Sequence, residues 1–184
     1  MVGSDVVLAK GFGERDVANE KAVTADTLFA IGSSTKAFTT LALATLVDEG
    51  RLDWDGRVVD YMPSFRLSDA DRTMAMTPRD LVTHRSGLPR HDLVWYGSDL
   101  SRAELVERLR YLDANQDLRQ GFQYQNMMYM TAGRLGEVIT AKTWEEMVRE
   151  RIFEPLGMNN SNFSVQDTQA AEVVQQIRQA GVVQ

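Results

Sequence analysis

The 184-residue chain contains no cysteine and only two histidines, His84 and His91. Without cysteine it forms no disulfide bond and carries neither a thiol nucleophile nor a cysteine-based metal site. The two histidines lack a convincing third ligand, so we expect neither a metal site nor an organic cofactor. The longest apolar runs are far shorter than the roughly 20 residues that a membrane-spanning helix requires, so we expect no segment that crosses a bilayer.

Positive charge is also scarce. Twenty Lys and Arg residues face 26 Asp and Glu residues, which gives a formal net charge of −6. Because no basic cluster is present to bind phosphates, nucleic-acid binding has no electrostatic support. Met1–Asp5 is neither cationic nor apolar, so we expect no export signal in the chain as written, and the localisation stays open. The balance of 43% hydrophobic and 25% charged residues is ordinary for one folded domain.

Hydrophobic spacing predicts a chain that is mostly helical. Val6–Ala9 is a short β-branched run, and it is the one strand that the pattern predicts. After Ser33, apolar residues recur at three- and four-residue spacing on almost every side, which predicts a buried helix that ends at Gly50. The segment from Arg51 to Met76 mixes scattered aspartates with apolar anchors, and we expect a packed loop there.

Three further helices are predicted from their first residues. Thr77, Ser101 and Thr143 are each followed by an acidic residue three positions later, which is the pattern of a capping box. The spacing of apolar residues also predicts a helix over 127–141 and a helical tail over 167–180.

A Ser-x-x-Lys tetrad opens the predicted helix after Gly32. Ser33 and Lys36 are almost one helical turn apart, so their side chains share a face and the amine can reach the hydroxyl. A serine hydroxyl becomes a good nucleophile when a neighbouring base takes its proton, and the positive end of the helix dipole favours an oxyanion beside the Ser33 amide. The alternative is structural: Ser33 caps the helix and Lys36 is a solvated residue of its first turn.

Tyr124 and Asn126 flank Gln125 in a turn directly before the helix predicted over 127–141. In an extended loop, side chains two residues apart point into the same space, where a phenol and a carboxamide can serve as proton carrier and substrate clamp. Alternatively, Tyr124 is a packed aromatic residue and Asn126 an ordinary helix cap. A third string, Leu81–Pro89, contains a helix end, a Gly turn and a Pro stop, and it needs no catalytic explanation.

Four motifs occur in a fixed order: Gly-Ser-x-x-Lys, Leu-Val-Thr-His-x-Ser-Gly-Leu-Pro, Tyr-x-Asn and Pro-Leu-Gly-Met. Together they resemble the serine β-lactamase and penicillin-binding-protein superfamily, and more specifically its class C-like branch of β-lactamase-related esterases and peptidases. The resemblance covers most of the chain, from Val6 to Met158. It implies that His84 and Ser86, in the second motif, belong to the scaffold.

The resemblance also implies a role for each residue of the other two central motifs. Ser33 would be the acylated nucleophile, and Lys36 its base or proton relay. Tyr124 would be the partner base. Asn126 would hydrogen-bond the substrate next to its reacting carbonyl group, and no metal would take part.

The chain departs from this family in two respects. It contains no Lys-Thr-Gly or His-x-Gly tripeptide, the third motif, which supplies the second oxyanion donor in the family. The family's N-terminal helix, first strand, last strands and C-terminal helix are also missing. We therefore expect the α/β fold of the family to be represented mainly by its helical domain, with one or few strands and an incomplete central antiparallel sheet. Val6–Phe12 would then be an unpaired strand, which favours association into a homo-oligomer.

These expectations combine into one hypothesis with two alternatives. The chain would be a single domain over 1–184, with a residual strand and lead-in (1–30), a helical catalytic region (31–165) and a helical tail (166–184). It would act as a serine hydrolase on the carbonyl of a small ester, amide or β-lactam, and loss of one oxyanion donor would slow it by about 10²–10³. The first alternative is a non-catalytic helical fragment that binds a partner or itself, and the second is an unrelated helical protein with accidental motifs.

Overall fold

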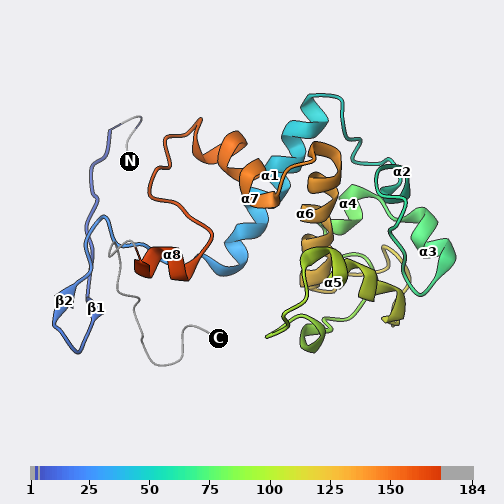
Figure 1. The fold of residues 1–184 in the computed structure, drawn as a ribbon, viewed down its shortest axis with the longest axis horizontal. Coiled ribbons are helices and arrows are strands. Elements are labelled where there is room, and N and C mark those ends of the chain that lie inside the picture. Colours follow the sequence, from blue (N-terminus) through green and yellow to red (C-terminus); the bar gives the residue numbers. More distant parts are fainter. Residues whose placement is uncertain (1–2, 4, 171–184) are drawn as a thin grey trace. The chain divides into compact units, whose positions relative to one another are not determined.

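The computed structural model describes residue 3 and residues 5–170 of the chain (Figure 1). The chain divides into two units. Ser33–Gly157 forms the first, which we call the helical unit, and Met1–Gly32 with Met158–Gln184 forms the second. All four residues of the predicted site belong to the helical unit.

The helical unit consists of short helices joined by ordered loops. Its elements in chain order are the 3₁₀ turn η1 (Gly32–Ser34), α1 (Thr35–Asp48), α2 (Val58–Tyr61), α3 (Ala70–Ala75), α4 (Pro78–Leu81), η2 (Asp92–Val94), α5 (Arg102–Arg108), η3 (Leu109–Tyr111), α6 (Asn126–Thr140), α7 (Trp144–Val148) and the π-helical turn η4 (Arg149–Phe153). Within the described ranges, no helix has the length and apolar character needed to span a membrane.

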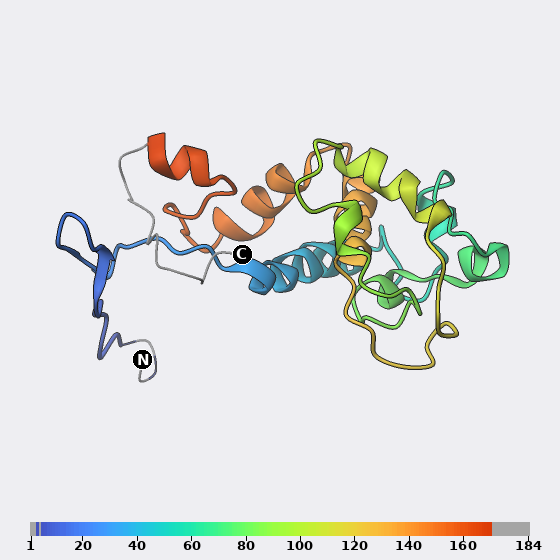
Figure 2. The same ribbon diagram turned by 90° about the horizontal axis from the view of Figure 1, so that it is seen from below.

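Helix α6 is the centre of this unit. It contacts α1, α5, α7, α4 and α2, and both views show it beside α1 and α5 (Figures 1 and 2). Leu43 of α1, Met128 and Leu135 of α6 and Met147 of α7 are fully buried between these helices. At Gly136 a Cβ atom would lie 2.6 Å from the terminal methyl group of Met147, so the Met147 side chain fills the space that this glycine leaves.

The predicted helix ends are confirmed where local hydrogen bonding determines them. Thr77, Ser101 and Thr143 each form a capping box, in which the hydroxyl accepts from the N3 amide and the N3 acid accepts from the cap. Gly50 follows α1 with φ +69°, and the amides of Gly50 and Arg51 donate back to the last turn of the helix. This is the arrangement in which glycine stops a helix without strain.

The strand prediction is wrong. Val6–Ala9 is exposed and extended but forms no strand, whereas β1 (Glu14–Asp16) and β2 (Lys21–Ala22) form a short antiparallel hairpin in the second unit. The Asp16 carboxylate accepts hydrogen bonds from the backbone and side-chain amides of Asn19, which closes the turn. The prediction of a strand at Val6–Ala9 rested on its apolar, β-branched composition. A strand also requires a neighbouring strand to pair with, and the turn between β1 and β2 brings these two segments together.

Two predictions for the helical unit also need correction. Helix α1 is not buried on all sides, because Leu41 is 48% exposed while Thr39, Ala42, Leu43 and Leu46 are buried. Apolar composition predicts that a helix can be covered, and which of its faces is covered depends on the neighbouring elements. The predicted loop between Arg51 and Met76 contains α2 and α3, which are too short to give a clear periodic signal.

The predicted helical tail begins as α8 (Val165–Ala170) in the second unit. Its remaining positions, 171–180, lie outside the described residues. The organisation into segments 1–30, 31–165 and 166–184 of a single domain stays a prediction.

Candidate active site

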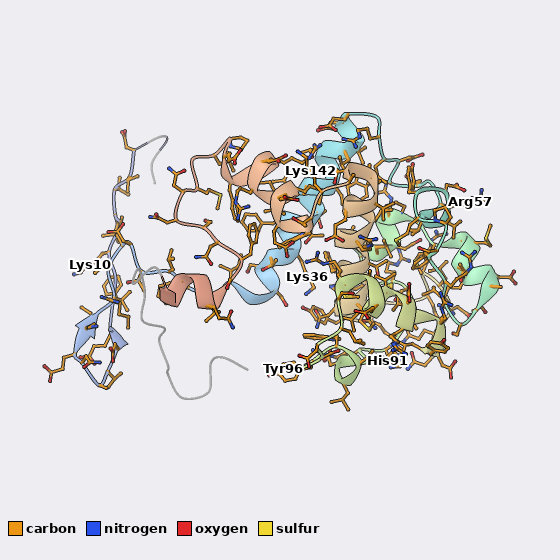
Figure 3. All side chains as sticks on the ribbon, in the orientation of Figure 1. Lys10, Lys36, Arg57, His91, Tyr96 and Lys142 are labelled. Atoms are coloured by element: carbon orange, nitrogen blue, oxygen red, sulfur yellow. The ribbon has the colours of Figure 1, made fainter. Side chains whose placement is uncertain are left out.

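The site begins at the first turn of α1. Ser33 lies in the η1 turn and is exposed, and Lys36 is the second residue of α1. The Lys36 Nζ donates to Ser33 Oγ at 3.1 Å, as their spacing in the sequence predicts. Lys36 extends from the first turn of α1 toward α6 (Figure 3). The N-cap of α1 is Ser34 and not Ser33, so the alternative in which Ser33 serves as the cap is wrong.

Tyr124 and Asn126 complete a closed cluster around the lysine. The Tyr124 hydroxyl is 2.5 Å from Ser33 Oγ and accepts from Lys36 Nζ at 2.7 Å, and Asn126 Oδ1 accepts from the same Nζ at 2.8 Å. The N-cap of α6 is Gln125, whose side chain accepts from the Met127 amide, so Asn126 is not the cap. The side chain of Asn126 is therefore free to face the lysine.

Lys36 donates a hydrogen bond to each of its three neighbours in the cluster. A lysine ammonium has three N–H donors and no acceptor. Ser33, Tyr124 and Asn126 supply three acceptors for Lys36, one for each N–H. The contact between Ser33 Oγ and the Tyr124 oxygen is a further hydrogen bond, in which either hydroxyl can be the donor.

The surroundings of Tyr124 change the pKa of its phenol. Burial by itself raises the pKa of the phenol, but the hydrogen bonds from Lys36 and Ser33 and the positive charges of Lys36 and Arg90 outweigh it. The net effect is a pKa below the ordinary value of about 10. Lys36 Nζ also lies 4.7 Å from the centre of the Tyr124 ring and 5.3 Å from that of Tyr129, so two aromatic faces surround the ammonium.

The loop that carries Tyr124, residues 112–125, is held by the string Leu81–Pro89. Four backbone amides of the loop donate to three carbonyls of the string: Gln123 to His84 (2.7 Å), Arg119 to Arg85 (2.8 Å), and Asn115 and Gln116 to Gly87 (3.1 and 3.3 Å). Gly87 has φ +79°, and a Cβ atom there would lie 2.3 Å from the Gln116 carbonyl oxygen. The backbone of Leu81–Pro89 therefore holds the loop in place, which agrees with the prediction that this string needs no catalytic explanation.

Two charged residues at the site were not singled out as site residues by the sequence. The Arg90 guanidinium lies 5.0 Å from the centre of the Tyr124 ring and donates to Asp92 at 2.6 Å. Asp92 Oδ1 accepts from Trp95 Nε1 at 3.1 Å and from Asn126 Nδ2 at 3.4 Å, which orients the Asn126 amide with its oxygen toward Lys36. The one signal in the sequence that could have indicated Arg90 and Asp92 is that they come shortly after the motif that ends at Pro89.

Neither histidine takes part in a metal-binding group. His84 is buried and accepts from the Gln125 amide, and His91 contacts the Asp113 carbonyl oxygen at 3.2 Å. Among the described residues, no three His, Cys, Asp or Glu side chains gather in a way that could hold a metal ion.

Comparison with known proteins identifies the family. The model of the Beta-lactamase family matches residues 1–181. The chain belongs to the β-lactamase family. Its relatives include hydrolases and penicillin-binding proteins, which places the chain in the corresponding serine hydrolase superfamily.

Individual relatives agree with this assignment. The chain is 35% identical over 171 residues to an unguisins hydrolase of Aspergillus campestris, with 88% of this chain and 32% of the relative covered. It matches an octameric penicillin-binding protein homologue from Pyrococcus abyssi at 32% identity and a TM-score of 0.78, with 90% and 39% covered. It matches a D-amino acid amidase from Ochrobactrum anthropi at 29% identity and a TM-score of 0.68, with 84% and 44% covered.

These matches confirm the predicted fold class. The described residues are rich in helix and contain two strands in one antiparallel sheet, and they match part of the β-lactamase and penicillin-binding-protein fold. The chain spans about a third of the length of the curated relatives it matches.

Proposed function

We propose that this chain carries the nucleophile and proton-transfer groups of a serine hydrolase that works through an acyl-enzyme on Ser33. The observation that carries the proposal is the closed contact of Ser33, Lys36 and Tyr124, with hydroxyl to hydroxyl at 2.5 Å and the lysine amine within 3.1 Å of both. A nucleophile, a base and a group that orients the base within hydrogen-bond reach are the signature of nucleophilic catalysis.

The proposed reaction starts with proton transfer from Ser33 to the Tyr124 oxygen. Ser33 Oγ attacks the substrate carbonyl carbon, and the carbonyl electron pair moves onto oxygen to give a tetrahedral oxyanion. As the intermediate collapses, the bond to the leaving group breaks and the leaving group takes the proton from Tyr124. Water then repeats the sequence on the ester at Ser33, releases the acid and restores the hydroxyl.

Lys36 and Asn126 support this transfer in different ways. The Lys36 charge next to the Tyr124 oxygen stabilises the phenolate form, which is the form that accepts the proton. Asn126 keeps its oxygen on Lys36 and directs its Nδ2 toward Asp92, so a substrate carbonyl could take the second Nδ2 hydrogen. The Ser33 amide, just before the N-terminus of α1, would provide one oxyanion donor.

We propose a carbonyl bonded to an ester oxygen, an amide nitrogen or a lactam nitrogen as the substrate group. Relatives named as an unguisins hydrolase, a D-amino acid amidase and penicillin-binding proteins support this range. The third motif is not in this sequence, and one missing oxyanion donor costs about 10²–10³ in rate. We therefore expect acylation that is slow and still measurable.

The experiment is intact mass spectrometry after incubation with a fluorophosphonate and, separately, with a penicillin. We expect one adduct, lost in Ser33→Ala and retained in Ser34→Ala, which removes a neighbouring exposed serine with no side-chain cap bond. Lys36→Ala and Tyr124→Phe should each slow adduct formation by orders of magnitude. Lys142→Ala, which removes an exposed lysine paired with Glu150, should not.

An adduct that forms equally in Ser33→Ala contradicts the proposal. So does the absence of any adduct on a chain that circular dichroism shows to be folded. The second result would favour the non-catalytic alternative, in which the chain binds a partner or itself, and concentration-dependent mass in solution would support that alternative.

A further inference from the structure

His84 contacts the segment around Tyr124 in three ways. Its backbone carbonyl accepts from the Gln123 amide at 2.7 Å, and its ring Nδ1 accepts from the Gln125 amide at 3.0 Å. Its imidazole stacks on the Tyr124 ring, with centroids 4.5 Å apart and an angle of 27°. The two hydrogen bonds therefore hold the residues on either side of Tyr124, and the stack holds its ring.

This arrangement requires one protonation state of His84. A ring nitrogen that accepts a hydrogen bond carries no proton, so Nδ1 is free of hydrogen and the neutral ring carries its proton on Nε2. His84 is 8% exposed, and its imidazole lies among Tyr124, Tyr129 and Phe122, with the Lys36 charge nearby. A second proton would remove the acceptor and put two positive charges close together.

We propose that His84, as the neutral tautomer protonated at Nε2, is a positioning residue that holds the Tyr124 phenol against Ser33 and Lys36. The proposal rests on the function proposed above, in which Tyr124 receives the serine proton. Its basis is geometric, because His84 alone binds the backbone amides on both sides of Tyr124 and stacks on the Tyr124 ring. Burial, and then the charge of Lys36, also lower the pKa of His84, which favours the neutral form.

The contribution of the acceptor can be separated from that of the ring by two variants. Asn places an acceptor oxygen close to the position of Nδ1, and it tolerates the left-handed backbone of residue 84, where φ is +57°. His84→Asn thus keeps the acceptor and loses the ring, whereas His84→Phe keeps a ring and loses the acceptor. Ala141 has the same left-handed backbone, with φ +57°, and is exposed at the C-terminal end of α6, so Ala141→Phe controls for the strain of phenylalanine in that conformation.

The first readout does not depend on activity. The pKa of Tyr124 is measured from the ¹³Cζ chemical shift of labelled tyrosine, with the signal assigned by Tyr124→Phe. In His84→Phe the phenol should move away from Lys36 and Ser33, so we expect its pKa to rise. In His84→Asn and Ala141→Phe we expect the pKa of Tyr124 to stay near that of the wild type.

The second readout is the rate of fluorophosphonate adduct formation. A misplacement of a reacting group by about 1 Å costs about 100-fold, so we expect His84→Phe to lose about 10- to 100-fold and His84→Asn to lose much less. Equal losses in His84→Asn and His84→Phe, with an unchanged pKa of Tyr124, would overturn the proposal. They would leave His84 with a purely structural role.

Two further results separate the role of His84 from the proposed role of Tyr124 in catalysis. If Tyr124→Phe is acylated at the wild-type rate, the proposed function fails, while the ¹³C titration still reports whether His84 positions the phenol. If His84→Phe does not fold, the ¹⁵N shifts of the wild-type ring decide. A ring protonated at Nε2 alone at neutral pH supports the proposal, and a proton on Nδ1 overturns it.

Discussion

The ion pair between Asp80 and Arg119 offers a direct test of how the Tyr124 loop is held. Asp80 lies in α4, and its carboxylate accepts from Arg119 Nε at 2.8 Å and from Arg119 Nη2 at 2.7 Å. The same carboxylate accepts from the Thr77 amide and hydroxyl in the capping box. We predict that Arg119→Ala destabilises the helical unit and slows acylation of Ser33, because Arg119 belongs to the loop that carries Tyr124.

The expected magnitude follows from the burial of each partner. The Asp80 side chain is 5% exposed, and removing one partner of a fully buried pair costs about 3–5 kcal/mol. The Arg119 side chain is 46% exposed, and Thr77 continues to donate two hydrogen bonds, so the loss is smaller. We expect the free energy of unfolding to fall by about 2 kcal/mol at pH 7.

A matched pair nearby isolates the effect of burial. Arg79 binds Asp55 with the same two-point geometry, Nε at 2.7 Å and Nη2 at 2.8 Å, but its side chain is 53% exposed and that of Asp55 is 66% exposed. Solvent screens such a pair, so Arg79→Ala should unfold close to the wild type.

The dependence on pH provides a second check. Burial raises the pKa of Asp80, but the hydrogen bonds from Arg119 and Thr77 outweigh it, so the folded-state pKa lies below its ordinary value of about 3.9. The stability from this depressed pKa is present above about 3.9 and is lost as the pH falls through the folded-state value. In Arg119→Ala burial is opposed only by the hydrogen bonds from Thr77, so the pKa of Asp80 rises and the difference in stability from the wild type should shrink between pH 7 and pH 4.

The assay is urea unfolding followed by circular dichroism, at pH 7 and pH 4, for the wild type, Arg119→Ala and Arg79→Ala. The reasoning is refuted if the two variants lose equal stability at pH 7. It is also refuted if the deficit of Arg119→Ala grows as the pH is lowered.

Three further predictions follow from single contacts. Gly87→Ala should lose more than about 2 kcal/mol of unfolding free energy by urea titration, because φ is +79° and the new Cβ would lie 2.3 Å from the Arg72 guanidinium. Leu43→Ala should lose about 3 kcal/mol in the same assay, since the side chain is fully buried between helices, and an unchanged midpoint would contradict that packing. The adduct-formation rate should rise with pH through the lowered pKa of Tyr124, and Arg90→Gln should shift this rise slightly to higher pH because a positive charge is lost. A rate in the wild type that does not change with pH would contradict Tyr124 as the base.

Much of the local structure could be predicted from the sequence. The capping boxes at Thr77, Ser101 and Thr143 and the stop at Gly50 depend on hydrogen bonds among residues a few positions apart, which the sequence specifies directly. The approach of Lys36 to Ser33 belongs to the same class, because it requires only one helical turn. The family could be recognised from the order of its motifs.

The remaining features depended on how elements pack. From apolar composition, the sequence predicted a strand at Val6–Ala9 and a helix α1 buried on almost every side, and both predictions were wrong. A strand needs a partner to pair with, and a buried face needs a neighbouring element to cover it. Neither is a property of the segment alone. The side-chain direction of Asn126 likewise followed from which residue became the cap of α6.

The assembly of the site shows the same division. The sequence by itself predicted that Lys36 can reach Ser33 within one helical turn and that Tyr124 and Asn126 lie close to the beginning of another helix. Only the tertiary structure decided that the Tyr124 hydroxyl meets Ser33 Oγ, 91 residues away in the chain. That contact exists because α6 packs beside α1 and because His84 and Gly87 hold the intervening loop. Such long-range contacts come from the burial of apolar faces and the pairing of backbone groups across the fold, which no local spacing encodes.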